Sequence, residues 1–385
     1  MRIRRARALA LFWREGELVL YNFLVPRALT ATPEVLTLLS DAESWREPQF
    51  FFDLFPDAEP ASVAEQISKL VALGALMVEG SPQAELDGEY ERAWEWGVPA
   101  GLYHFGVKYQ RYATEKETRT LLRHRIKTRP APSLTTGNAH GDEVVQLPRP
   151  RATGVLGTMF ARRTERWFGR RPIGAAQLCR CLYGGLGITG FVEDAELGPL
   201  PLKMAPSGGA RNPYEGYVYV RNVSDVPPGV YHYSGVENSL GLVARPPLPP
   251  AAKLLSEQEW TNDAAAVVFL VASFERTNWK YPHPNSYRVI AIEAGHIVQN
   301  ILLLATEQRL AAAPTAALQE APLEALLHID PIRQGVIYAV ALGNPAKRRS
   351  FSIRRAYSAP TEQRWARKSP QSKIHRQRHM REVSE

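Results

Sequence analysis

Hydrophobic positions in residues 1–82 predict a small domain of short strands and helices. Residues 17–25 are typical of a strand, and residues 45–54 form a second, weaker apolar segment. Between them, Thr30 or Thr32 provides an N-cap for a helix, because a side-chain oxygen at this position accepts a backbone N–H. The apolar positions of this helix are Val35, Leu36, Leu38 and Leu39.

A second predicted helix begins at a capping box formed by Ser62 and Glu65. Gly74 is its predicted C-cap, and residues 75–78 form a short strand. Helices followed by such a strand resemble a winged-helix module, similar to the peptide-recognition elements of enzymes that modify ribosomal peptides. The pattern is generic, since other winged helices bind DNA or dimerise.

Residues 83–153 are interpreted as a connecting region. Residues 89–96 favour a short amphipathic helix, and residues 100–105 favour a turn and a strand. Residues 127–153 contain several prolines and glycines and few large apolar groups, which predicts a loop.

From residue 154 to residue 352 the pattern changes to alternating helices and strands. Two helices are expected, over 173–186 and 288–310. Strands are expected over 214–221, 229–233, 264–274 and 335–342. This order predicts an α+β domain with a mainly antiparallel sheet and long helices packed on it.

The 385 residues, 45% of them hydrophobic, are sufficient for two buried cores. No apolar run reaches the roughly 18 residues of a membrane helix, and the N-terminus lacks a signal-peptide pattern. A soluble cytoplasmic protein with no membrane partner is therefore expected. Cys179 and Cys181 are too few for a closed zinc site, so no metal is predicted, and they are interpreted as small residues on a helix face.

The net charge of +8 is concentrated in a tail over residues 353–385. Residues 354–385 carry nine Lys or Arg and three Asp or Glu, with few apolar groups. This composition favours a disordered, solvated tail, with capture of an acidic partner as the alternative. Nucleic acid is not expected, because Trp365 is the only tryptophan available there for stacking on bases.

A glycine-rich turn precedes the strand over 214–221. Its residues are Pro206, Ser207, Gly208, Gly209, Ala210, Arg211 and Asn212. Glycine lacks Cβ, so such a turn can approach a flat ring or an anionic group closely, although an ordinary β-turn would have the same composition. With its strand, the stretch is similar to the PSGGAR-x-P-x-E-x-Y-V sequence of the SagB-type branch of the nitroreductase-like superfamily. The resemblance implies FMN contacts for Pro206, Ser207, Gly208, Gly209, Arg211 and Asn212.

A second segment resembles the Lys-Tyr pair, the Tyr-Arg pair and the EAGH-x-x-QN helix of the same branch. These residues are Lys280-Tyr281, Tyr287-Arg288 and 293–300. The resemblance implies that Lys280 and Tyr281 handle the proton in catalysis, and a partly desolvated lysine is chemically suited to accept one. A surface lysine beside a packing tyrosine is the alternative. His296 is interpreted as a packed core histidine.

A third segment, 161–168, resembles the R-x-S/T-x-R-x-F start of nitroreductase-like domains. Guanidinium groups bind phosphate in a bidentate manner, and Arg162 and Arg166 would share a face if the segment were helical. The resemblance implies that the FMN phosphate and ribityl chain are held by Arg162, Arg163, Thr164 and Arg166, with Lys347 and Arg348 as further candidates.

One segment departs from the family pattern. Residues 309–315 read RLAAAPT where many relatives carry a glycine-rich stretch that helps to cover the flavin. The resemblance therefore implies two readings. The first is an FMN-dependent homodimer that oxidises thiazolines or oxazolines in a ribosomally made peptide, with a cyclodehydratase complex as one setting. The second is a peptide-binding scaffold with an altered flavin site, and a flavin reductase of dehydroamino acids is a further alternative.

Overall fold

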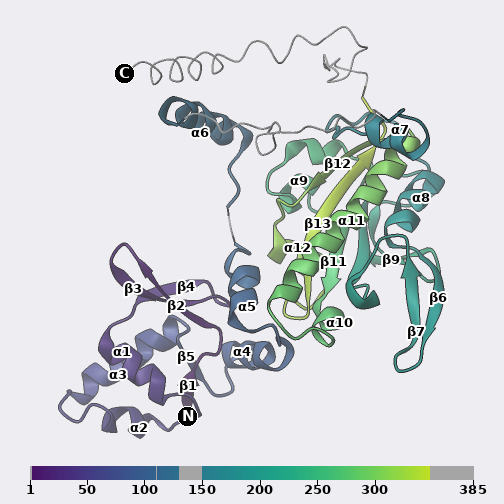
Figure 1. Cartoon of the computed structure of the whole chain (residues 1–385). Helices are drawn as coiled ribbons and strands as arrows, with labels where there is room; N and C mark the ends of the chain where they lie inside the picture. Colours follow the sequence, from purple (N-terminus) through teal and green to yellow (C-terminus); the bar gives the residue numbers. More distant parts are fainter. Residues whose placement is uncertain (1, 110, 130–149, 347–385) are drawn as a thin grey trace, which may run out of the picture. The chain divides into compact units, whose positions relative to one another are not determined.

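The computed structural model of the chain describes residues 2–109, 111–129 and 150–346. A six-stranded sheet forms the centre of its C-terminal part, in the order β10-β9-β8-β11-β13-β12 (Figure 1). Every neighbouring pair in this sheet is antiparallel, which confirms the predicted α+β class. The strands are β8 (Tyr214–Val220), β9 (Gly229–Ser234), β10 (Ser239–Ala244), β11 (Ala266–Ser273), β12 (Ala311–Thr315) and β13 (Gln334–Gly343).

Strand β11 lies in the middle of this sheet because it is apolar on both faces. Val268 and Leu270 belong to the core on one face, whereas Val267 and Phe269 belong to the core on the other. Successive side chains of a strand point to opposite faces, so a continuous apolar run is what a doubly covered strand requires. Helices α8 (Ala175–Leu186) and α11 (Asn285–Glu307) contribute to the first core, and α9 (Ala251–Leu254) and α12 (Glu320–Leu327) to the second.

Helices α8 and α11 are in close contact through small residues. A Cβ at Gly184 would lie 2.0 Å from Cδ1 of Leu304, and one at Gly185 would lie 2.8 Å from Cγ1 of Ile301. Cys179 and Cys181 lie on α8, half-buried and buried respectively, which agrees with their interpretation as packing residues. By length and composition alone, α11 could cross a membrane, and in this structure it packs in the core of the domain.

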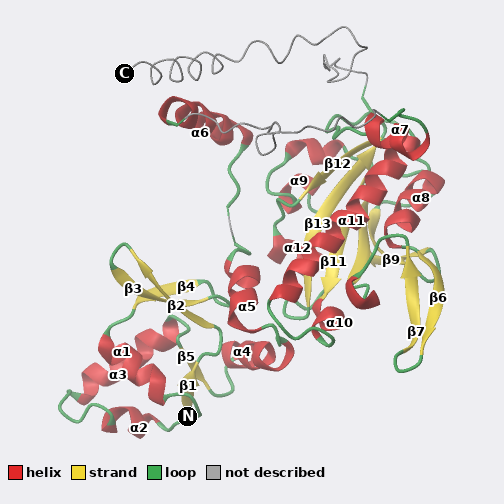
Figure 2. Cartoon of the chain, in the orientation of Figure 1, coloured by secondary structure: helices red, strands yellow, loops and turns green. Residues whose placement is uncertain are grey.

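The N-terminal part contains three helices, a pair of strands and a three-stranded sheet (Figure 2). Thr32 caps the first helix as predicted, by accepting the N–H of Val35. The third helix begins at Pro60, so the capping box predicted from Ser62 and Glu65 is wrong: proline fits the first helical turn and starts the helix earlier. The elements are β1 (Ile3–Arg5), β2 (Leu9–Arg14), β3 (Glu17–Asn22), β4 (Arg27–Thr30), α1 (Pro33–Asp41), α2 (Pro48–Asp53), α3 (Pro60–Ala72) and β5 (Leu76–Val78).

The connecting region is more regular than its sequence predicts. It contains α4 (Pro82–Ala93), α5 (Gly97–Gly106) and α6 (Glu115–Thr128). The strand predicted over residues 100–105 is wrong, because these residues form α5. A Cβ at Gly101 would lie 2.7 Å from the Tyr90 hydroxyl, so the glycine permits close packing of α5 on α4. Residues 130–149 of the predicted loop, and the tail from residue 347, lie outside the described residues.

Four further elements complete the part that positions the candidate site. These are α7 (Gly154–Ala161), a hairpin of β6 (Ile188–Asp194) and β7 (Gly198–Lys203), and the short helix α10 (Phe274–Asn278). The hairpin was not predicted, because most of its side chains are only partly covered and carry no clear apolar alternation.

Candidate functional site

The glycine-rich turn is fixed by hydrogen bonds of its own residues. The Ser207 hydroxyl accepts the N–H of Asn212 at 2.8 Å, and the N–H of Gly208 donates to the Glu293 carboxylate on α11 at 2.7 Å. Burial raises the pKa of Glu293, while the hydrogen bonds from Gly208 and Ser207 lower it. The Asn212 amide donates to the carbonyls of Pro201 and Ala210, so in a single chain it holds the turn against β7.

Gly209 brings this turn into contact with the predicted catalytic pair. Its φ of 61° lies in the left-handed region, and a Cβ would lie 2.4 Å from the Tyr281 hydroxyl and 3.0 Å from Nζ of Lys280. Lys280 Nζ donates to the Gly209 carbonyl at 3.5 Å and lies 5.6 Å from the centre of the Tyr281 ring. The structure therefore joins two motifs that are about 70 residues apart in the sequence.

The exposure of Lys280 and of His296 differs from the sequence-based expectation. The Lys280 side chain is exposed, so a single chain does not supply the desolvation that the catalytic reading assumed. His296 is also exposed on α11, and its interpretation as a packed core histidine is wrong. The period of α11 turns His296 away from the buried stripe that contains Ala294, Ile297 and Ile301.

Arg211 extends from the same turn towards α10. Its Nε donates to the Arg276 carbonyl at 2.8 Å, and its guanidinium lies 4.9 Å from the centre of the Trp279 ring. Pro206, at the start of the turn, is exposed.

The predicted phosphate-binding arginines follow α7 in an extended segment. Helix α7 ends at Ala161, so the segment is not helical and the condition under which Arg162 and Arg166 would share a helix face is not met. The N–H of Glu165 donates to the Ala312 carbonyl at 3.0 Å, which places the segment beside the edge strand β12. Residues 162–166 have no regular secondary structure, and this bond attaches them to the sheet edge.

The side chains of this segment leave positive charge at the surface. Arg163 donates to the carbonyls of Phe160 and Arg162, and the Arg166 guanidinium lies 5.6 Å from the Trp260 ring centre. Thr164 is exposed, and no carboxylate among the described residues forms an ion pair with Arg162. Lys347 and Arg348, the other phosphate candidates, lie outside the described residues.

Helix α7, which precedes the arginines, and helix α10, which Arg211 of the glycine-rich turn contacts, lie at opposite ends of the sheet (Figure 1). Tyr214, which follows the turn, pairs with Ala272, whereas the other end of β8, Val220, pairs with Ala266. Ala266 of β11 pairs with Leu342 of β13, and Leu342 pairs with Ala312 of β12. Ala312 is the residue to which the arginine segment is hydrogen-bonded. Strand β8 has seven residues and spans about 20 Å, at about 3.3 Å per residue. Within one chain the two groups are therefore separated by about the length of β8.

The connecting region contributes residues that sequence reasoning missed. The indole N–H of Trp96 donates to the Tyr281 carbonyl at 2.9 Å, and the Asn278 amide donates to the Ala93 carbonyl at 3.1 Å. These bonds hold both ends of the segment that carries Lys280. Their partners are about 185 residues apart in the sequence, so no local pattern indicates them.

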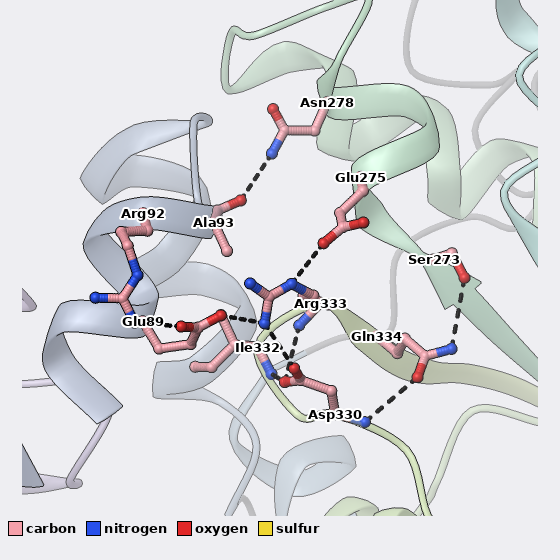
Figure 3. Close-up of polar contacts among 10 residues, drawn as sticks. All are labelled: Glu89, Arg92, Ala93, Ser273, Glu275, Asn278, Asp330, Ile332, Arg333 and Gln334. Atoms are coloured by element: carbon pink, nitrogen blue, oxygen red, sulfur yellow. Dashed lines mark hydrogen bonds and ion pairs between the residues drawn. The ribbon is translucent and has the colours of Figure 1, made fainter. Parts of the chain in front are cut away.

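Arg333 connects the same elements through charge (Figure 3). Its guanidinium forms ion pairs with Glu89 on α4, with Glu275 on α10 at 2.6 Å, and with Asp330 at 2.9 Å. Nearby, His104 Nδ1 lies 2.8 Å from the Tyr287 hydroxyl, and burial lowers the pKa of His104 to about 3. Neutral His104 is thus part of the packing between α5 and α11.

Residues 159–344 match the model of the nitroreductase family. This part of the chain is a nitroreductase-family domain. Its sheet and its two long helices form the nitroreductase-like fold, and the family match supports FMN as the cofactor of the domain.

Two curated proteins align with the nitroreductase-family domain. MJ1384 of Methanocaldococcus jannaschii, named as a nitroreductase, is 28% identical over 189 residues, which cover 48% of this chain and 89% of MJ1384. The trifolitoxin-processing protein TfxB of Rhizobium leguminosarum bv. trifolii is 32% identical over 143 residues. That alignment covers 36% of this chain and 38% of TfxB.

Solved structures that match this chain include a nitroreductase-type protein of Ralstonia eutropha. It has a TM-score of 0.43 and 21% identity, over 57% of this chain and 99% of that chain. The E. coli microcin synthetase McbBCD complex with truncated pro-MccB17 bound has a TM-score of 0.44 and 17% identity. That match covers 63% of this chain and 87% of that chain.

Proposed function

We propose that the nitroreductase-family domain is an FMN-dependent oxidoreductase that acts on a ribosomally made peptide. Members of the family are typically FMN-dependent oxidoreductases. The observation that carries the proposal is the pairing of a glycine-rich turn with Lys280 and Tyr281, while half-buried Arg162 and exposed Arg166, which suit a phosphate, lie at the other end of the sheet.

The residues present fit FMN in two separate sets. Arg162 and Arg166, with the Thr164 hydroxyl, are suited to the phosphate and the ribityl chain, because charged donors at the surface can reach an anion without losing a carboxylate partner. The backbone of the turn at Gly208 and Gly209 has no Cβ and is suited to a flat ring. Bound FMN would supply the hydride chemistry.

A homodimer would unite the two sets. Helix α7 lies against α11, and both helices expose apolar side chains: Val155 is 69% exposed, Met159 46% and Ile292 52%. Such exposed apolar groups on neighbouring helices favour burial against a second copy. The second copy would also cover Lys280, and desolvation would then favour its neutral, proton-accepting form.

The finer proposal is oxidation of azolines to azoles. A thiazoline or oxazoline ring loses a proton and a hydride, so the protein must provide a base near the ring. Lys280 Nζ and the Tyr281 hydroxyl, both beside Gly209, are the groups proposed to accept the proton. The similarity to the trifolitoxin-processing protein TfxB supports a peptide as the substrate. The winged-helix-like N-terminal part is proposed to recognise the peptide, in a complex with a cyclodehydratase where one is present.

The first test is flavin content. The purified chain is expected to be yellow and to release FMN on denaturation, and Arg162→Ala combined with Arg166→Ala is expected to lose the colour. Arg180→Ala is a matched control, because Arg180 is an exposed arginine of the same domain that pairs with Glu307. A colourless wild-type chain that cannot be reconstituted with FMN would contradict the proposal.

The second test concerns the proton. Lys280→Ala is expected to retain FMN and to lose azoline oxidation by about a hundredfold, since general acid–base catalysis contributes roughly 10²–10⁴-fold. Mass spectrometry of a thiazoline-containing peptide would follow the loss of two hydrogens per ring. Unchanged turnover by Lys280→Ala would remove Lys280 from the mechanism.

A scaffold function is the second candidate, and β12 favours it. Residues Ala311, Ala312 and Ala313 are buried in this edge strand, where many relatives carry glycines. Backbone with Cβ atoms approaches a flavin less closely than glycine does. A chain that binds peptide but no FMN would support the scaffold. A yellow chain that reduces dehydroamino acids and does not oxidise azolines would support the reverse reaction.

A further inference from the structure

A pocket of about 540 Å³ adjoins the glycine-rich turn, whose residues Ala210, Arg211 and Asn212 belong to its lining. The β6–β7 hairpin forms one wall, and the start of β8, the end of β9 and Arg276 form the other. Lys280, Tyr281 and the segment 162–166 do not line it, whereas Arg211 and Asn212 do, so the pocket directly adjoins the turn proposed to contact the flavin ring. Its volume is in the range of small-ligand sites.

The charged residues that line the pocket carry more positive than negative charge. The Glu215 carboxylate is matched by Arg276 and by His232, whose Nε2 lies 3.1 Å from it. Burial alone would raise the pKa of Glu215, but the His232 hydrogen bond and the Arg276 guanidinium lower it to about 2, so this pair is internally neutralised. The charges of Lys203 and Arg211 are not balanced in this way.

Lys203 and Arg211 have no carboxylate partner among the described residues. Lys203 Nζ donates only a long hydrogen bond, 3.4 Å, to the Tyr214 carbonyl. Burial lowers the pKa of Lys203 and Arg276 adds to this, although Glu215 and Glu293 attract its charge without forming an ion pair and oppose the shift. Arg211 uses Nε for the Arg276 carbonyl, stacks on Trp279 and lines the pocket. Two cations that form no ion pair with a described carboxylate and line one pocket provide charge-assisted donors for a ligand.

Other residues of the lining are apolar. They are Leu186, Ile188, Phe191 and Leu197. Phe191 is 55% exposed and Leu197 37% exposed, so a ligand in the pocket would remove apolar surface from water. The pocket therefore combines an apolar side with a cationic side.

We propose that this pocket binds a carboxylate next to an apolar group, with the carboxylate on Lys203 and Arg211 and the apolar group on the β6–β7 hairpin. The natural ligand is an acidic residue of the peptide substrate, located beside the ring that reacts. Assignment of the ligand to the substrate rests on the proposed function, whereas the carboxylate site itself does not. The pocket would set which sequence positions next to an acidic residue are modified.

The probe is a pair of capped dipeptides, N-acetyl-leucyl-glutamate amide and its glutamine counterpart, titrated into the full chain by calorimetry. The acid is expected to bind about tenfold more tightly than the amide, as a charge-assisted hydrogen bond implies. N-acetyl-leucyl-leucine with a free carboxyl end distinguishes a terminal carboxylate from a side-chain carboxylate. The measurement needs neither turnover nor flavin. A failure of the carboxylate site can therefore be told apart from a failure of the proposed function.

Three variants identify the site. Lys203→Met is expected to abolish the preference for acid over amide, and Lys203→Arg to retain it. Lys253→Met is the matched control, since Lys253 is an exposed lysine paired with Glu257 away from the pocket. If Lys203→Met does not fold, Leu197→Asp serves as the second variant. It places a negative charge on the hairpin and is expected to weaken binding of the acid and to leave binding of the amide unchanged. The proposal would be overturned if the wild-type chain bound acid and amide equally, or if the variants expected to lose the preference for the acid retained it. It would also be overturned if inorganic phosphate displaced the acid and the amide equally well.

Discussion

Gly209 is the residue at which backbone conformation and the proposed chemistry coincide. Its φ is 61°, and the space that a Cβ would need is taken by the Tyr281 hydroxyl and Lys280 Nζ. A substitution here strains the backbone and also displaces the two side chains proposed to handle the proton. Sequence motifs indicated all three residues, because each lies in a contiguous stretch, but only the structure shows that they touch.

Gly209→Ala is expected to lower the free energy of unfolding by about 1 kcal/mol, the usual cost of a side chain in the left-handed region. Gly190→Ala is the matched control, since Gly190 lies in β6 with open space around it and is expected to change stability by less than about 0.5 kcal/mol. Chemical denaturation of both variants measures the difference. Equal effects at the two positions would show that Gly209 is not constrained.

Glu320 is expected to make stability depend on pH near neutrality. Burial raises its pKa to about 7 from an ordinary value of 4.5, with Glu324 adding to the rise and Lys108 opposing it. The folded chain then holds this proton more tightly than the unfolded chain. The stabilisation is complete below about pH 4.5 and is lost as the pH rises through about 7.

Glu320→Gln removes this dependence, because glutamine keeps the shape and does not ionise. At pH 8 the variant is expected to be more stable than the wild type by about 3 kcal/mol, and at pH 4.5 the two are expected to be nearly equal. Denaturation curves at both pH values measure the gap. A gap of the same size at pH 4.5 and pH 8 would exclude ionisation of Glu320 as its cause.

At the scale of elements, α4 and α5 hold the segment between α10 and α11. Trp96 contacts Phe274 and Tyr287 with its ring and donates its N–H to the Tyr281 carbonyl. Trp94 lies in the same aromatic cluster but donates to the Gly97 carbonyl. The two tryptophans therefore differ in the carbonyl that accepts their indole N–H, so Trp94 is a control for substitution of Trp96.

Trp96→Phe is expected to speed hydrogen exchange in residues 279–283 and to lower turnover. An aromatic ring remains, but it is smaller, so the variant loses buried volume as well as one hydrogen bond worth about 1 kcal/mol. Trp94→Phe is expected to reduce stability by a similar amount and to leave exchange in this segment unchanged. Hydrogen–deuterium exchange with peptide resolution makes the comparison, and faster exchange in both variants would indicate general loosening.

Which elements could be predicted depended on how local their signal is. Strand β11 has a continuous apolar run and α11 a long periodic one, and both were confirmed. Helix α5 was predicted as a strand, because its packing on Tyr90 and Trp94 decides its conformation and is not visible in a sequence window. For the same reason the roles of Trp96, Arg333 and Lys203 could not be predicted: their partners are distant in the sequence or lie in a pocket that only the fold creates.

At the scale of the whole molecule, the connecting region shares a core with the nitroreductase-family domain. Tyr90, Trp96 and Phe105 are buried in the same apolar cluster as Ile290 and Ile297 of α11. Residues 90–105 therefore act as part of the wall around the candidate site. The division of the chain at residues 82 and 153, and the winged-helix assignment of its first part, stay predictions.

The central claim is that one FMN is held by the arginine segment of one subunit and the glycine-rich turn of its partner. It can be tested by mixing two variants that each fail alone. Arg162→Ala with Arg166→Ala removes the phosphate donors, and Gly209→Val blocks the turn. Each purified variant is expected to be colourless when its dimer contains only that chain.

Refolding the two variants together creates mixed dimers, in which one of the two sites has both sets of wild-type residues. The measurement is bound FMN per chain. The predicted result is recovery to about a quarter of the wild-type content, because about half of the dimers are mixed and half of their sites are complete. A mixture that stays colourless would contradict a site shared between subunits.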